Sequence, residues 1–149
     1  MKKVLASLLL LAGLTAVSSC EDDKETVVAP TNMLTVTGTL SGAQQVPPVP
    51  TPGTGSVSGS FNTTTNELSY TITYSGLTGA PVAGHFHIAP PGQANPTPTL
   101  GLAGLSTPIT AKATLTVPQR EALLAGNLYA NLHTAAYGSG EVRANLTAK

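Results

Sequence analysis

The residues with the clearest capacity for chemistry are the three histidines of this 149-residue chain. Two of them, His85 and His87, alternate with apolar residues in a run typical of a β-strand. Side chains at i and i+2 of a strand share a face, so both imidazoles are expected to point the same way, about 7 Å apart along the strand. The third, His133, ends a second strand-like run at 128–133. Three imidazoles with an open fourth position suit Zn or Cu, so a metal site is predicted if these strands are neighbours.

A metal-bound histidine usually donates its second ring N–H to a nearby acceptor. Three residues near His133 are candidates for that role: Glu141, Asn131 and Thr134. The alternative is that the histidines only form hydrogen bonds or face solvent, with His133 at a turn. Glu141 and Arg143 stand two residues apart, and we expect them to form an exposed ion pair worth about 0–1 kcal/mol.

The composition excludes several other chemistries. Lys and Arg total seven, with no cluster beyond Lys2 and Lys3, so a nucleic-acid partner is not expected. After Asp23 the chain has no Asp and only three Glu, which removes a Ser-His-Asp triad and leaves few carboxylate pairs. Glycine-rich phosphate loops are missing too, so no nucleotide partner is expected. These absences favour a binding protein over an enzyme.

The N-terminal segment is predicted to be an export signal. Lys2 and Lys3 precede an apolar stretch, 4–17, that is too short for a permanent membrane span. Val17-Ser18-Ser19-Cys20 then resembles the lipobox of bacterial lipoproteins, in which the Cys thiol takes the lipid. Cys20 is the only cysteine, so no disulfide can form within the chain. Three segments follow: a lipoprotein signal peptide at 1–19, the lipidated Cys20 with a flexible linker at 20–31, and a folded domain at 32–149.

An acidic run at residues 21–25 follows the cysteine. It resembles a surface-export tag of some Gram-negative lipoproteins, and a solvated tether is the alternative. We therefore expect an exported protein, held at the outer membrane of a Gram-negative bacterium by a lipid on Cys20. Whether it reaches the periplasmic or the cell-surface leaflet stays open, as does the identity of any protein or matrix partner.

Short alternating runs predict the strands that must position the histidines. The chain is 41% hydrophobic and 9% charged, and its 15 Gly and 12 Pro favour a turn-rich β fold over long helices. The expected strands lie near 33–40, 57–61, 68–74, 82–88, 111–116, 128–133 and 141–146. One short helix is expected between Thr116, a capping residue, and Gly126. The residues that alternate with the first two histidines should fill the core: Val82, Gly84, Phe86 and Ile88. We predict an all-β, antiparallel two-sheet sandwich with one short helix.

Three motifs between Leu34 and Leu146 resemble the CHRD domain, which was first named in chordin and occurs in many bacterial secreted proteins. The opening motif is Gly42–Val49, where Gln45 replaces the usual acid. The second is Gly84–Ile88, which contains the His-x-His pair, and the third spans 124–146. The resemblance implies an extracellular domain of β-strands. Because chordin binds growth factors, it also implies a binding module.

The His-x-His strand is also similar to part of the copper site of Cu,Zn superoxide dismutases, so the sandwich could be immunoglobulin-like or a dismutase-like Greek key. The fourth His and the Asp of that site are missing here. Three hypotheses follow. The first is a lipid-anchored binding module that holds one Cu or Zn ion through His85, His87 and His133. The second is a degenerate dismutase-like copper redox protein at the same site. The third is a structural adhesion or matrix domain.

Overall fold

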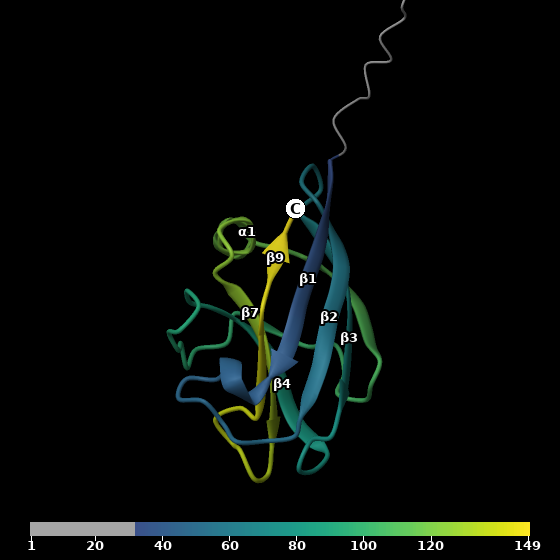
Figure 1. Ribbon diagram of the computed structural model, residues 1–149. Coiled ribbons are helices and arrows are strands. Elements are labelled where there is room, and N and C mark those ends of the chain that lie inside the picture. The colour runs from purple at the N-terminus through teal and green to yellow at the C-terminus, as the bar shows by residue number, and fades with distance from the viewer. Residues whose placement is uncertain (1–31) are drawn as a thin grey trace, which may run out of the picture.

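The structure, a computed structural model, describes residues 32–149 (Figure 1). The predicted signal peptide, lipobox and linker lie outside these residues. Apart from a 3-10 turn, η1 (Gly42–Gln44), the regular elements are nine strands and one helix. They are β1 (Met33–Ser41), β2 (Thr54–Asn62), β3 (Glu67–Ser75), β4 (Pro81–Ile88), β5 (Leu100–Gly101), β6 (Ile109–Thr114), α1 (Val117–Leu124), β7 (Leu128–Thr134), β8 (Val142–Asn145) and β9 (Thr147–Ala148).

The strands form one continuous antiparallel sheet, in the order β5-β4-β7-β8-β1-β2-β3-β6, with β9 also paired to β1. The sheet curls so that its two halves face each other, as the crossing strands in Figure 1 show. Tyr70 of β3 and Phe86 of β4 meet across the interior, with ring centroids 5.1 Å apart in an edge-to-face contact. The all-β class with one short helix is confirmed. The two predicted sheets are halves of a single sheet, because β1 pairs with both β2 and β8.

The core lies between the two halves and follows the period-two pattern of the sequence. Val36 and Leu40 of β1, together with Ile72 of β3, are completely buried, whereas the threonines that alternate with them lie on the outside. Phe86 and Gly84 of β4 are buried as predicted, but Val82 is 60% exposed. The register of β4 against β7 shifts between Pro81 and Ala83, which breaks the alternation at this end of the strand.

Helix α1 begins and ends where its capping residues predict. Gln119 Oε1 accepts a hydrogen bond from the Thr116 backbone N–H at 2.8 Å, which is half of a capping box. Gly126 ends the helix region with a φ of 73°, a left-handed conformation that costs glycine little. The helix packs near β7 and β9, away from the histidines.

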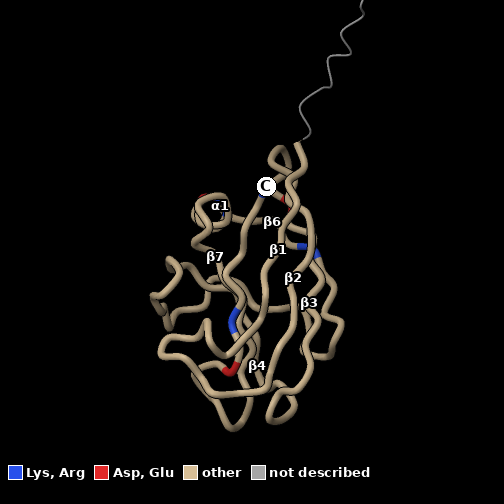
Figure 2. Tube along the Cα trace, viewed as in Figure 1, with Lys and Arg blue, Asp and Glu red and all other residues tan. Residues whose placement is uncertain are grey.

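Charged side chains are sparse on this fold (Figure 2). Residues 32–149 carry four basic and three acidic ones: Lys112, Arg120, Arg143, Lys149, Glu67, Glu121 and Glu141. Within the same residues, the one ion pair joins Lys112 to Glu67 at 2.8 Å. No helix in this part of the chain is long and apolar enough to cross a membrane.

Candidate metal centre

Strands β4 and β7 are neighbours, which brings the three histidines together. His85 lies opposite Asn131 and His87 lies opposite Tyr129, while His133 pairs with Ala83 one step further along. All five polar or aromatic side chains therefore occupy the same face of the sheet, the one turned away from the Phe86 side. The condition on which the sequence-based metal hypothesis depended, that the two strands adjoin, is therefore met.

The ring nitrogens lie close enough to share one ion. One nitrogen from each of the three histidines lies within 4.8 Å of the others. His85 Nδ1 and His133 Nε2 are 3.4 Å apart. Two nitrogens bound tetrahedrally to one Zn²⁺ would also be about 3.4 Å apart, given Zn–N bonds of about 2.1 Å.

Main-chain carbonyls orient two of the rings. His87 Nδ1 donates to Thr97 O at 3.1 Å, and His133 Nδ1 donates to Gly138 O at 3.0 Å. In each neutral ring the proton on Nδ1 leaves a lone pair on Nε2. His87 Nε2 is buried and has no hydrogen-bond partner among the described residues. This arrangement, with Nδ1–H on a carbonyl and Nε2 free, is the one that metal-binding histidines usually adopt.

The surroundings favour neutral imidazoles. Burial lowers the pKa of His85, and the neighbouring His133 lowers it further. Burial also lowers the pKa of His87, although the hydrogen bond to Thr97 works in the opposite direction. Because a proton competes with a metal ion for the same lone pair, lowered pKa values keep the ligands available at neutral pH.

Tyr129 connects the histidines to a buried arginine. Its ring stacks on His87, with centroids 5.0 Å apart and planes 8° from parallel. Arg143 of β8 places its guanidinium carbon 3.5 Å from the centroid of the same ring, a cation–π contact. Since β7 lies between β4 and β8, the two contacts come from opposite sides of Tyr129.

Two loops cover this face of the sheet. The 89–99 loop is held by Asn95, whose backbone and Tyr129 OH exchange hydrogen bonds of 3.1 and 3.3 Å. The η1 turn, from which the second loop continues, is held by Gln44 Oε1, which accepts from the backbone and side-chain nitrogens of Asn145. Between the loops and the sheet lies a cavity of about 330 Å³, lined by His87 and His133 among others. The prospective metal site therefore borders a partly open cavity.

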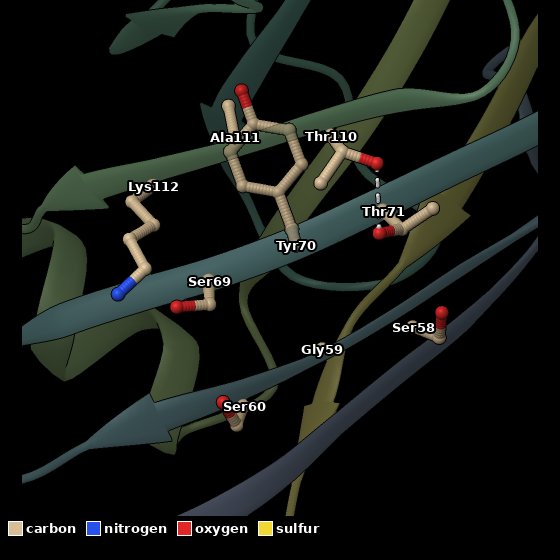
Figure 3. A pocket seen from close by; sticks show the side chains of 9 residues that line it. All are labelled: Ser58, Gly59, Ser60, Ser69, Tyr70, Thr71, Thr110, Ala111 and Lys112. Carbon is tan, nitrogen blue, oxygen red and sulfur yellow. Dashed lines mark hydrogen bonds between the residues drawn. The ribbon is translucent and has the colours of Figure 1, made fainter.

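A larger and shallower hollow lies on the other half of the sheet (Figure 3). Ser, Thr and Gly residues of β2, β3 and β6 line it, together with Tyr70 and Lys112. Among its hydroxyl groups, those of Thr71 and Thr110 hydrogen bond to each other at 3.1 Å. It contains no imidazole or carboxylate, so the chemistry of this domain concentrates on the histidine side.

Two of the predicted supporting residues lie elsewhere. Asn131 does contact the cluster, but its Oδ1 lies 3.2 Å from His133 Nε2, the nitrogen that faces the other histidines, whereas Gly138 O accepts the proton on Nδ1. Glu141 and Thr134 instead hydrogen bond to each other at 2.6 Å. Thr51 and Thr78 also donate to Glu141, which is fully buried. The expected surface ion pair with Arg143 is wrong. Glu141 precedes β8, directly after Gly140 with its positive φ, and its carboxylate is bound by three threonines instead of by Arg143.

Sequence reasoning missed the residues that complete this face. Tyr129, Gln45 and the carbonyls of Thr97 and Gly138 were not assigned to the site. The Tyr129 side chain had a signal, since it alternates with Asn131 and His133 on one strand. Arg143 also carried a sequence signal, because a lone arginine between Val142 and Ala144 is flanked by core positions. The contacts with the carbonyls of Thr97 and Gly138 carried no sequence signal, because they depend on the paths that the loops take.

Comparison with known proteins agrees with this fold and its motifs. The model of the CHRD domain family matches residues 36–146, which include all three histidines. Searches of the curated proteins and of the solved structures gave no match. The chain belongs to the CHRD domain family.

Proposed function

We propose that this protein is an envelope-anchored binding module of the CHRD family that holds one metal ion through His85, His87 and His133. The observation that carries the proposal is the combination of a free, buried Nε2 on His87 with a second lone pair on His133, both oriented by main-chain carbonyls. A buried nitrogen without a partner costs free energy unless a ligand completes it.

Metal binding by His85 would require its ring proton to change position. Without metal, His85 Nδ1 and His133 Nε2 share a hydrogen bond at 3.4 Å. If His85 Nδ1 were to hold a metal ion, the single proton of the neutral ring would have to lie on Nε2 instead of Nδ1. Zn and Cu both accept three imidazoles. A metal ion held by these residues would lie beside the cavity, because His87 and His133 line it.

Metal titration of the purified protein tests the proposal. The Cys20→Ser background removes the single thiol as a competing ligand. Calorimetry with Zn²⁺ and Cu²⁺ should show one site per chain. The variants His85→Ala, His87→Ala and His133→Ala should each weaken binding by more than the about 10–100-fold that changes outside the ligand set cost.

The control is Lys112→Ala, an exposed change on the opposite half of the sheet, which should leave affinity unchanged. No metal bound above background, or an affinity equal to wild type in all three histidine variants, would refute the metal proposal and leave a structural adhesion or matrix domain. Copper binding together with superoxide consumption would instead favour the redox protein.

The envelope anchor has its own test. If Cys20 carries the lipid, labelled palmitate should enter the wild-type protein and not Cys20→Ala. The variant should also move from the membrane fraction to the soluble fraction. Unchanged partitioning and labelling of Cys20→Ala would contradict the anchor while leaving the metal site untouched.

A further inference from the structure

The cavity beside the histidines has a second chemical character, which is a single uncompensated positive charge. Arg143 lines it and is 1% exposed. Within residues 32–149, no carboxylate pairs with this guanidinium, and none lines the cavity. Burying a cation without a counter-ion is costly, so an anion that enters the cavity gains electrostatic stabilisation.

The guanidinium of Arg143 also has N–H donors that no hydrogen bond among the described residues uses. Its nitrogens donate to Asn145 Oδ1 at 2.9 Å, to Gln93 O at 2.6 Å and to Pro90 O at 3.4 Å. These bonds engage three of the five N–H groups of an arginine, which leaves two. The same three bonds hold the side chain in place, so the remaining donors are preorganised.

A second donor is available in the same cavity. Gln45 lines it and is 8% exposed, and its Nε2 has no hydrogen-bond partner among the described residues. A methyl group on Gly140 would collide with this nitrogen, so the backbone of that turn makes room for the amide. A buried amide donor without an acceptor is a site that a ligand oxygen can complete.

The other residues that line the cavity limit the charge and the polarity of the ligand. One fixed charge matches a monoanion, and Val46, Ala94 and Pro96 contribute apolar surface. We propose that this cavity binds a small monocarboxylate, whose oxygens accept hydrogen bonds from Gln45 Nε2 and Arg143 and whose short apolar body lies against these three residues. The site goes beyond the proposed metal function and does not require the metal.

Nuclear magnetic resonance of the metal-free protein tests this site. Isotope-labelled Cys20→Ser protein, stripped with EDTA, is titrated at constant ionic strength with acetate and with its neutral analogue acetamide. Acetate should shift the Gln45 side-chain amide and Arg143 Nε–H signals to saturation. Acetamide should bind about tenfold more weakly, since it lacks the charge. Propionate and butyrate should bind more tightly, by at most about fourfold per methylene.

Variants at Gln45 avoid removing the buried arginine. Gln45→Leu should weaken acetate by about tenfold, because one donor is lost. Gln45→Glu supplies an internal carboxylate of the same size and should abolish the acetate shifts. Lys112→Gln removes a distant cation and should change nothing. Equal shifts with acetamide, or shifts that follow Lys112 rather than the cavity, would overturn the proposal. Because no metal is present, this outcome is independent of whether the histidines bind an ion.

Discussion

At the scale of single residues, the buried carboxylate of Glu141 is stabilised by hydrogen bonds. Glu141 accepts four hydrogen bonds, from Thr51 Oγ1 at 2.5 Å, Thr134 Oγ1 at 2.6 Å, Thr78 Oγ1 at 2.8 Å and Thr78 N at 2.9 Å. Burial by itself would raise the pKa of Glu141, but these hydrogen bonds outweigh it and lower the pKa below its usual value. Glu141 thus joins three separate segments as an ionised acceptor.

Replacing Glu141 by Gln should destabilise the fold, because the amide nitrogen cannot accept from a hydroxyl. A hydrogen bond to a charged group contributes about 1.5–3 kcal/mol, and we expect a loss of that order. Urea unfolding followed by circular dichroism measures it. Glu121→Gln, an exposed change on helix α1, is the matched control and should stay within about 0.5 kcal/mol of wild type. Equal stabilities of the two variants would contradict the role of Glu141.

At the scale of elements, the 89–99 loop determines how His87 is oriented. Asn95 holds the loop through its side chain, with Nδ2 donating to Ile88 O at 2.9 Å and Oδ1 accepting from Thr97 N at 2.9 Å. Thr97 O in turn accepts from His87 Nδ1. The loop is therefore a connection between local turn geometry and the lone pair of a prospective ligand.

Asn95→Ala should weaken metal binding without removing a ligand. Loss of two hydrogen bonds frees Thr97, so His87 no longer has one fixed orientation, and we expect about a tenfold loss of affinity. Gln93→Ala in the same loop is the control, since only its main-chain oxygen contacts Arg143. Calorimetry measures the metal affinity of both variants. A similar loss in Gln93→Ala would show general loop damage rather than loss of the Asn95 contacts.

At the scale of the whole molecule, the curled sheet places one face of a strand pair under loops and thereby buries titratable groups. The pKa values of His85 and His87 are lowered from 6.5, and that of Glu141 is lowered from 4.5. In each case the unfolded chain binds protons at a higher pH than the folded chain does. The free energy of unfolding therefore rises with pH in two ranges, one where the histidines titrate and one where Glu141 titrates.

The metal-free protein should accordingly lose stability in two steps as the pH falls. Above about pH 6.5 the histidine contribution is complete, and it declines as the pH falls from 6.5 towards the lowered pKa values. A second decline begins near pH 4.5, as Glu141 approaches protonation. Urea midpoints between pH 3 and 8 measure both. Glu141→Gln should remove most of the lower step and His87→Asn should reduce the upper one, whereas a flat profile would contradict both assignments.

Much of the fold was predictable because strand alternation is a local property. The pattern of Leu68, Tyr70 and Ile72 indicates a half-buried strand whichever strand lies beside it. The capping residues of α1 are local signals too. The short strands β5 and β9 carry too few residues to form a pattern, and only their pairing partners define them. The prediction of two separate sheets failed in its detail because hydrogen bonding between β1 and β8 is a long-range feature.

The sequence by itself determined that His85 and His87 share a strand face, that Tyr129, Asn131 and His133 share another, and that the family motifs are those of the CHRD domain. Only the tertiary structure decided that these two faces adjoin, since strand order depends on the packing of the entire chain. It also decided that three threonines hydrogen bond to Glu141, whereas Arg143 lies beside a cavity without a carboxylate partner among residues 32–149. The physical reason is that periodicity sets the face on which a side chain lies, whereas long-range pairing and loop paths set what it meets there.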